Sequence, residues 1–268
     1  DTYGDYIVDH DGEVSYFEPA VFIVPRKKDI EKTLKLWARY SDSDGGVLPS
    51  DCCFSPGVDP ERTLVLIKPG NFKGPSSMAG NVIDVISRTG LKIVGARIVH
   101  MSLAQAEKFY GPVKPVLAGK MKNLLVEWLK NSLSRQLDFP IPESVYPELA
   151  DLLKEYKGRD EFNKILRSMS GRDPNKVRTQ KEKNAPGLEK CLALIYQGEK
   201  AISRIRAVLG ATDPTKAGWA TIRRIYARSI MENVAHASDS SDNFIRETGI
   251  IKMEENNLKK IIREFYRK

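Results

Sequence analysis

Apolar residues recur along this chain in short runs and in helical periods, and the two patterns alternate. Runs of apolar residues that stop at turn residues predict buried strands at Thr63–Lys68, Leu91–Val99 and Cys191–Tyr196. Apolar residues three and four positions apart predict a helix after each run. A long interruption separates the second strand and its helix from the third strand. The order strand-helix-strand, insertion, strand-helix-strand favours an α/β (α+β) fold, a split βαβ sandwich with an antiparallel sheet.

Residues 1–60 precede this pattern as an N-terminal extension. Glu13–Val24 has strand character, and Asp29–Tyr40 has the period of an amphipathic helix. No constellation of catalytic residues is evident in this extension. We therefore expect the chemistry to lie further along the chain.

The first half of the core spans residues 61–111. A helix is expected from about Ser77 to Thr89, between the first two strands. Ser102 then opens a short helix, because Gln105 completes a capping-box pattern with it.

Residues 112–188 form a mostly helical insertion. Three apolar stretches at 124–129, 146–153 and 162–166 each have helical spacing. Residues 172–187 are polar and charged with almost no apolar side chains, which predicts a mobile linker.

The second half of the core spans residues 189–250. Its predicted elements after the strand are a helix at Glu199–Leu209, a helix at Thr221–Met231, a short strand at Asn233–Ala235 and a helix at Ser240–Glu247. Apolar residues on one side of the tail, 251–268, predict a further helix.

Composition narrows the class of protein only partly. No apolar run approaches the roughly 18 residues that a membrane helix needs, and Asp1–Gly12 lacks the features of a signal peptide. The chain has three cysteines, Cys52, Cys53 and Cys191. An odd number argues against a framework of disulfides, and no pair of them has the spacing of zinc ligands. We therefore expect a cytoplasmic protein without a membrane partner.

The chain is basic, with a net charge of +8 and a pI of about 9.2, which favours anionic ligands. Residues 112–187 have a net charge of about +5, so nucleic-acid binding through the insertion is a separate hypothesis. Charge runs are usually solvated faces, and nucleic acid is therefore not the expected partner.

One histidine stands out as a candidate for chemistry. The chain has neither a G-x-x-x-x-G-K-[ST] phosphate loop nor a G-x-G-x-x-G dinucleotide motif. His236 lies between small residues in Asn-Val-Ala-His-Ala-Ser-Asp-Ser, so its ring is reachable, whereas His10 and His100 lack such a setting. Cations and hydroxyls crowd the preceding segment: Arg206, Thr212, Lys216, Arg223, Arg224 and Arg228. Phosphoryl transfer needs such groups around phosphate oxygens. From this stretch alone, a structural histidine and a nucleophile remain equal alternatives.

Four stretches together resemble the nucleoside diphosphate kinase family. They are Glu61-Arg62-Thr63 with Lys68-Pro69-Gly70, the loop Leu209–Pro214, the triplet Thr221-Ile222-Arg223, and Asn233–Ser240 with its His-x-Ser-Asp motif. The likeness covers roughly 110 of the 268 residues, at about 61–111 and 191–249.

This resemblance implies a ferredoxin-like αβ sandwich with a four-stranded antiparallel sheet, and a ping-pong transfer of the γ-phosphoryl group through a phosphohistidine on His236. It implies nucleoside di- and triphosphates as partners, Mg²⁺ bound to the nucleotide with no protein ligands, and a homo-oligomer. The positions implied to hold phosphates and sugar are Lys68, Tyr110, Arg206, Thr212, Arg223 and Asn233; those that support the histidine are Ser238 and Glu247.

Some positions depart from the family pattern. Gly70, followed by Asn71, stands where the family usually has Asp, and Ala237 stands where it usually has Gly. The insertion replaces a short helix and loop that forms one wall of the nucleotide site. The aromatic residue that stacks on the base is therefore open among Phe109, Trp128 and Phe139, and a catalytically weak regulatory module is the alternative to an active kinase.

Overall fold

The computed structural model describes residues 4–19, 23–41, 46–48, 54, 60–74, 77–230, 232–255 and 258–266. These residues divide into two compact units, one of 1–45 with 256–268 and the other of 46–255. Within the described parts of the chain, no helix is both long and apolar enough to cross a membrane.

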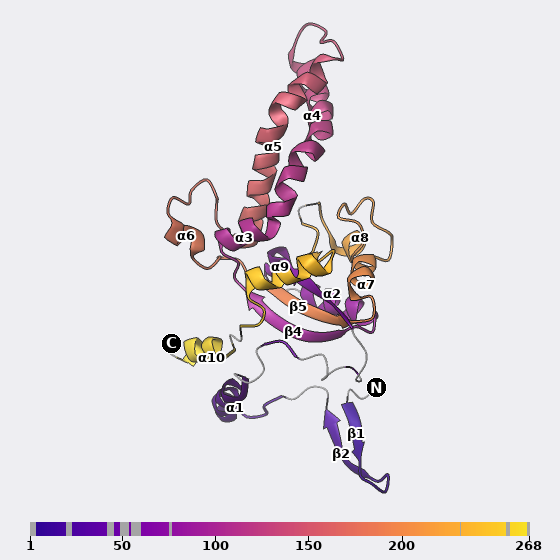
Figure 1. Ribbon diagram of the computed structural model, residues 1–268, viewed down its shortest axis with the longest axis vertical. Helices are drawn as coiled ribbons and strands as arrows, with labels where there is room; N and C mark the ends of the chain where they lie inside the picture. Colours follow the sequence, from indigo (N-terminus) through magenta and orange to yellow (C-terminus); the bar gives the residue numbers. More distant parts are fainter. Residues whose placement is uncertain are drawn as a thin grey trace. The chain divides into compact units, whose positions relative to one another are not determined.

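The larger unit is built on a four-stranded antiparallel sheet with the strand order β4-β5-β3-β6 (Figure 1). The strands are β3 (Glu61–Ile67), β4 (Lys92–Val99), β5 (Cys191–Gly198) and β6 (Ala235–Ala237). β5 pairs with β3 and with β4, and β6 pairs with the other side of β3. This sheet confirms the predicted α+β sandwich.

Both faces of the sheet are buried, because neighbouring residues of β3 enter different cores. Leu64 and Leu66 belong to one core, and Val65 and Ile67 belong to the other. Side chains of successive strand residues point to opposite faces, which explains this division. The second core is formed with α2 (Met78–Ser87) and α7 (Ala201–Leu209), and the first with α3 (Leu103–Tyr110) and the end of α9 (Ser241–Ile251).

Helix α3 begins as the sequence predicts. The Ser102 hydroxyl accepts a hydrogen bond from the Gln105 N–H, and the Gln105 side chain accepts one from the Ser102 N–H. The last residues of α3, Phe109 and Tyr110, are buried. The capping box therefore fixes the start of a helix whose end faces the centre of the fold.

The insertion is one antiparallel helical hairpin, formed by α4 (Lys114–Gln136) and α5 (Val145–Ser170), which projects from the sandwich (Figure 1). The second and third predicted stretches are thus one helix. Gly158 of α5 lies so close to α4 that an added Cβ would be 3.0 Å from the backbone of Ala118. The far half of the hairpin has a core of its own, formed by Leu125, Leu129, Tyr146 and Ala150.

The near half of the hairpin belongs to the main core. Phe162, Leu166 and Met169 of α5 pack in the same cluster as Phe109 and Tyr110 of α3. The insertion is therefore attached to the core by apolar packing as well as by its two chain connections.

The segment after α5 has defined backbone contacts. Gly171 ends α5 with a φ of 70°, and α6 (Gln180–Asn184) starts with a capping box of Thr179 and Glu182. The Gly187 N–H donates to the His100 carbonyl, and the Leu188 N–H donates to the Ser170 carbonyl. The mobility expected for 172–187 stays a prediction, although both ends of the segment are tied to the core.

Three element boundaries in the second half of the core differ from the predictions. The strand predicted at Asn233–Ala235 lies at Ala235–Ala237, because Val234 adopts a φ of 71° that no strand residue has. The helix predicted at Thr221–Met231 is only α8, Ile222–Tyr226, because Ala227 is extended; Met231 lies outside the described residues. Helix α9 continues to Ile251, where Lys252 in the left-handed region ends it.

The smaller unit contains a hairpin of β1 (Gly4–Val8) and β2 (Val14–Pro19), with helices α1 (Lys27–Tyr40) and α10 (Leu258–Tyr266). β1 was not predicted, and β2 is shorter than the predicted Glu13–Val24, of which residues 20–22 lie outside the described residues. α10 starts later than the predicted tail helix, after the turn that follows α9.

Candidate active site

His236 lies on the edge strand β6, directly after a strained turn. It lies opposite Leu66 in the pairing of β6 with β3. Directly before it, the Ala235 N–H donates to the Asn233 carbonyl at 2.8 Å across Val234, which forms a γ-turn with positive φ. A β-branched residue in this region is rare and strained, and such strain persists where the surrounding structure over-determines it. Here two donors, the Lys68 N–H and the Asn71 side-chain amide, bind the Val234 carbonyl.

The imidazole of His236 is oriented by a buried carboxylate. Its Nε2 lies 2.9 Å from Oε1 of Glu247, and Oε2 of Glu247 accepts a hydrogen bond of 2.7 Å from the Ser238 hydroxyl. Both Glu247 and Ser238 are buried, whereas the His236 side chain is 25% exposed. An ionised carboxylate only accepts, so Nε2 donates the proton and Nδ1 keeps its lone pair.

Arg246 completes the setting of Glu247. Its guanidinium donates to Oε1 of Glu247 at 3.2 Å and to the carbonyls of Lys108 and Phe109 at 3.1 Å each. A buried carboxylate needs charge and hydrogen-bond partners, and Arg246 supplies both. It also joins α9 to α3. The sequence analysis missed this residue, although its position next to Glu247 was a usable signal.

Two aromatic rings of α3 flank the histidine. The Phe109 ring lies 5.0 Å from the His236 ring in an edge arrangement, and the Tyr110 ring lies 6.0 Å from it. The Tyr110 hydroxyl is buried with no hydrogen-bond partner among the described residues. Burial raises its pKa well above the usual value, so this hydroxyl stays protonated. The Tyr110 side chain therefore places a hydrogen-bond donor without an acceptor among the described residues close to the histidine.

Lys68 is the cation nearest to the start of the γ-turn. Its Nζ donates to Oδ1 of Asn233 at 2.6 Å. Burial, with the positive charge of Arg223 adding to it, lowers the pKa of Lys68 to about 8. An amide partner cannot neutralise this lysine, so its charge remains available to an anion.

Arg223 joins the same group of cations. Its two Nη groups donate to the carbonyls of Gly210 at 2.7 Å and Ala235 at 2.9 Å, while its buried Nε–H has no partner among the described residues. Burial, and then the charge of Arg206, lowers the pKa of Arg223 to about 10. Arg206 is exposed in the last turn of α7. Positive charge therefore exceeds negative charge on the side of the site that holds Lys68, Arg206 and Arg223.

Of the nine residues implied by the resemblance, eight are linked by the direct contacts or by the charge interactions described above. Thr212 is the exception. It is exposed in the loop after α7, and within the described residues its side chain makes no hydrogen bond. Its contact with phosphate stays a prediction.

Asn71 is a further residue of the site that sequence analysis noted only as a departure. Its side-chain amide donates to the carbonyls of Lys68 and Val234, both at 2.8 Å. An Asp here has no donor for these two carbonyls. Asn71 therefore fixes the strained turn and the loop of Lys68 to each other.

The three candidates for the aromatic residue that stacks on a base differ in their exposure. Phe109 is buried against His236 and offers no free face. Trp128 and Phe139 are 61% and 59% exposed, in α4 and in the connection between α4 and α5. Across the residues that the structure describes, no group of three or more His, Cys, Asp or Glu is placed to hold a metal ion.

The class of protein that this ferredoxin-like sandwich and its group of cations favour is a phosphotransferase. The family model for nucleoside diphosphate kinase matches residues 61–117 and 182–257. Residues 118–181, which include most of the helical hairpin, separate the two matched parts. The second match begins at residue 182, earlier than the predicted boundary at 189.

Relatives agree with this match. A nucleoside diphosphate kinase of Phenylobacterium zucineum is 30% identical over 183 residues, which cover 68% of this chain and 87% of the relative. One of Fervidobacterium nodosum is 27% identical over 190 residues, covering 71% and 87%. The solved structure of an NDP kinase from Pyrobaculum aerophilum has a TM-score of 0.50 and 21% identity, and covers 74% of this chain and all of that one, which supports the fold. The chain belongs to the nucleoside diphosphate kinase family, a family of phosphotransferases.

Proposed function

We propose that this chain transfers the γ-phosphoryl group of a nucleoside triphosphate to a nucleoside diphosphate through a phosphohistidine at Nδ1 of His236. The hydrogen bond between Nε2 and Glu247 is the observation that supports this most directly. It fixes the proton on Nε2 and turns the lone pair of Nδ1 away from the protein carboxylate. A neutral imidazole oriented in this way is a nucleophile.

The reaction balances in two steps. The Nδ1 lone pair attacks the γ-phosphorus, the bond from this phosphorus to the β–γ bridging oxygen breaks, and the nucleoside diphosphate leaves with the electron pair. A terminal β-oxygen of a second diphosphate then attacks the phosphorus, and the N–P electron pair returns to Nδ1. Glu247 holds the same proton on Nε2 throughout and stabilises the positive charge on the phosphorylated ring.

The surrounding donors are proposed to neutralise phosphate charge. Lys68, Arg206 and Arg223 supply positive charge, and Tyr110 and Thr212 supply neutral O–H donors. Asn233 positions the Lys68 ammonium through its 2.6 Å hydrogen bond. Positioning and charge neutralisation are the main contributions that proteins make to phosphoryl transfer.

We further propose that Mg²⁺ accompanies the nucleotide, because this ion prefers oxygen ligands such as those of phosphate. It would supply positive charge to the phosphates, while the protein supplies the histidine and the cations described above. The buried free thiol of Cys191 suits a reducing compartment such as the cytoplasm, which we propose as the location.

Replacing the nucleophile tests the proposal. On incubation with γ-labelled ATP and Mg²⁺, the native chain should acquire label that is lost in acid, and His236→Ala should acquire none. Phosphohistidine hydrolyses in acid and phosphoserine does not, so the acid step identifies the residue type. His100→Ala is the matched control and should label normally. Acid-stable label, or label that persists in His236→Ala, would refute the assignment.

A catalytically weak nucleotide-binding module of the same fold is the second candidate. The contacts of Arg223 favour it, because both Nη groups already bind backbone carbonyls. A coupled assay with ATP and a second nucleoside diphosphate separates the two candidates. Nucleotide binding without turnover would identify the module, and turnover that requires His236 would identify the kinase.

A further inference from the structure

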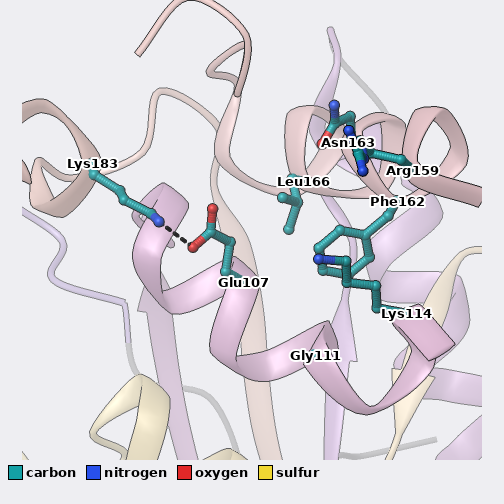
Figure 2. A pocket seen from close by; sticks show the side chains of 8 residues that line it. All are labelled: Glu107, Gly111, Lys114, Arg159, Phe162, Asn163, Leu166 and Lys183. Carbon is teal, nitrogen blue, oxygen red and sulfur yellow. Dashed lines mark ion pairs between the residues drawn. The ribbon is translucent and has the colours of Figure 1, made fainter. Parts of the chain in front are cut away.

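A second concave site lies at the base of the helical hairpin, with a volume of about 430 Å³ (Figure 2). Its lining comes from α3, from the turn Gly111–Val113, from the ends of α4 and α5 that adjoin the core, and from α6. The lining residues are Glu107, Gly111, Lys114, Arg159, Phe162, Asn163, Leu166 and Lys183. None of them is a residue of the proposed active site, and four lie between the two parts of the chain that match the family. This pocket is therefore mostly a product of the insertion.

The pocket has an excess of positive charge. Three cations line the pocket: Lys114, Arg159 and Lys183. Lys183 forms an ion pair of 2.5 Å with Glu107 and is thereby neutralised (Figure 2). Lys114 has its ammonium 5.7 Å from the centre of the Phe162 ring. Among the described residues, neither Lys114 nor Arg159 forms a salt bridge with a carboxylate. Two uncompensated cations therefore border the same hollow, beside the side-chain amide of Asn163.

The floor of the pocket is apolar. Phe162 and Leu166 are 6% and 1% exposed, and both belong to the main core. An apolar floor with a few convergent polar groups is the usual composition of a small-molecule site, and its volume lies within the range of about 300–1,000 Å³. Apart from Glu107, which is paired with Lys183, the charged and polar groups here are cations and an amide, so the ligand must combine negative charge with an apolar body.

We propose that this pocket binds a small phosphate monoester with an aromatic or aliphatic body. A phosphate monoester has a charge of about −1.5 to −2 near pH 7, which matches the two unpaired cations. Arg159 and Lys114 bind the phosphate oxygens, Asn163 donates to a third oxygen, and the organic body lies on Phe162 and Leu166. The proposal is independent of phosphoryl transfer at His236.

Phenyl phosphate is the probe, and isothermal calorimetry is the measurement. The protein is first saturated with ADP and Mg²⁺, so that the active site is filled. The native chain should bind phenyl phosphate at one site and bind inorganic phosphate more weakly, because inorganic phosphate lacks the body that covers the floor. Equal affinity for the two probes would contradict the role of the floor. A native chain that binds neither probe at millimolar concentration would overturn the proposal.

Charge variants locate the site. Lys114→Gln with Arg159→Gln should weaken phenyl phosphate binding by about tenfold or more, because charge-assisted hydrogen bonds are lost. Lys120→Gln is the control, since it removes a positive charge from an exposed position of α4 outside the pocket. Unchanged affinity in the double variant, or equal weakening in Lys120→Gln, would overturn the proposal. Thermal melting should show that the variants fold alike.

A change of opposite sign completes the test. Glu107→Gln removes the carboxylate that competes for Lys183, so Lys183 becomes available to the phosphate. The affinity for phenyl phosphate should rise in this variant. A general loss of structure cannot produce this increase, and a decrease would overturn the assignment of Glu107 as a competitor for the pocket cation.

Discussion

The residues around His236 form a linked set, in which a buried carboxylate orients the imidazole and is itself held by two neighbours. Glu247 orients the imidazole, and Ser238 and Arg246 hold Glu247. His236 and Ser238 were predicted because they fall in the His-x-Ser-Asp motif. Glu247 was predicted because it follows this motif at the distance that the family resemblance implies. Sequence analysis missed Arg246 because an arginine on a helix is indistinguishable from a solvated one until the fold brings carbonyls of α3 beside it.

Glu247→Gln tests the role of the buried carboxylate. Glutamine keeps the shape, but its amide nitrogen cannot accept from His236, Ser238 or Arg246, so at least one of these donors loses its acceptor. Because a hydrogen bond to a charged group is worth about 1.5–3 kcal/mol, the rate of His236 phosphorylation should fall roughly 10- to 150-fold. Rapid-quench single-turnover labelling measures it, with the exposed Glu254→Gln as the control. A native-like rate in Glu247→Gln would show that the carboxylate is dispensable.

The lowered pKa of Lys68 predicts a dependence on pH. Below about pH 8 the free protein has Lys68 charged, and above it the charge is lost. The kcat/KM of phosphoryl transfer should therefore fall as the pH rises through about 8. Because the folded pKa lies below the unfolded value of 10.5, the unfavourable contribution of Lys68 to stability is full below about pH 8 and is relieved as the pH rises from about 8 to 10.5.

Lys68→Arg is the control for this profile, since an arginine keeps its proton throughout the range. The decline near pH 8 should disappear from the profile of this variant, whatever its absolute rate. A decline that persists unchanged would assign the titration to another group.

At the scale of elements, the core strands were predicted well, whereas the short elements and the extent of α5 were not. The core strands β3, β4 and β5 appear within two residues of their predicted limits, because their runs are apolar and stop at turn residues. β6 is shifted because the positive φ of Val234 is a product of bonds to Lys68 and Asn71, which the local sequence does not encode. Two predicted stretches merged into α5 because a single helix can bury different faces along its length: Tyr146 and Ala150 against α4, and Phe162 against the core.

The crossing of α4 and α5 depends on Gly158. A Cβ at this position would lie 3.0 Å from the Cα and N of Ala118, and helix backbone cannot give way as a flexible side chain can. Gly158→Ala should therefore destabilise the protein, because overpacking costs about 1–3 kcal/mol and exceeds the gain in helix propensity of about 1 kcal/mol.

Gly119→Ala in α4 is the matched control. An added Cβ there meets nothing within 4 Å, so only the propensity gain applies and stability should rise. Chemical denaturation of both variants gives the two changes in the free energy of unfolding. If both variants are stabilised, the close approach at Gly158 does not constrain the hairpin.

At the scale of the whole molecule, the sequence separates the kinase core from its additions. The smaller unit combines residues 1–45 with residues 256–268. The sequence does not indicate this pairing of the tail with the N-terminal extension, because the helices of the two segments share no motif. The homo-oligomer implied by the resemblance stays a prediction that light scattering can test. The boundaries of the insertion at 112 and 188 stay a prediction, which rests on the difference between its apolar spacing and that of the strands around it.

The segment after α5 makes a prediction for the intact chain. Limited digestion with trypsin should cut first within residues 172–183, where Lys176 and Arg178 are exposed. Bound nucleotide should slow this cut, because Lys183 is paired with Glu107 on α3, the helix that ends at Tyr110. Peptide mapping with and without ADP and Mg²⁺ measures both effects. A first cut elsewhere that is indifferent to nucleotide would leave the hairpin as a peripheral addition.

The central strand pair has a kinetic consequence. β3 pairs with β5 so that Ile67 lies opposite Leu192, with the whole hairpin in the intervening chain. Closing so long a loop is entropically unfavourable and makes such folds slow to form. The α4–α5 hairpin needs only the short connection at 137–144, so it can collapse early and bring Lys114 near Ser170. Folding of the hairpin then shortens the effective loop, so that the insertion offsets part of the closure entropy that its own length adds.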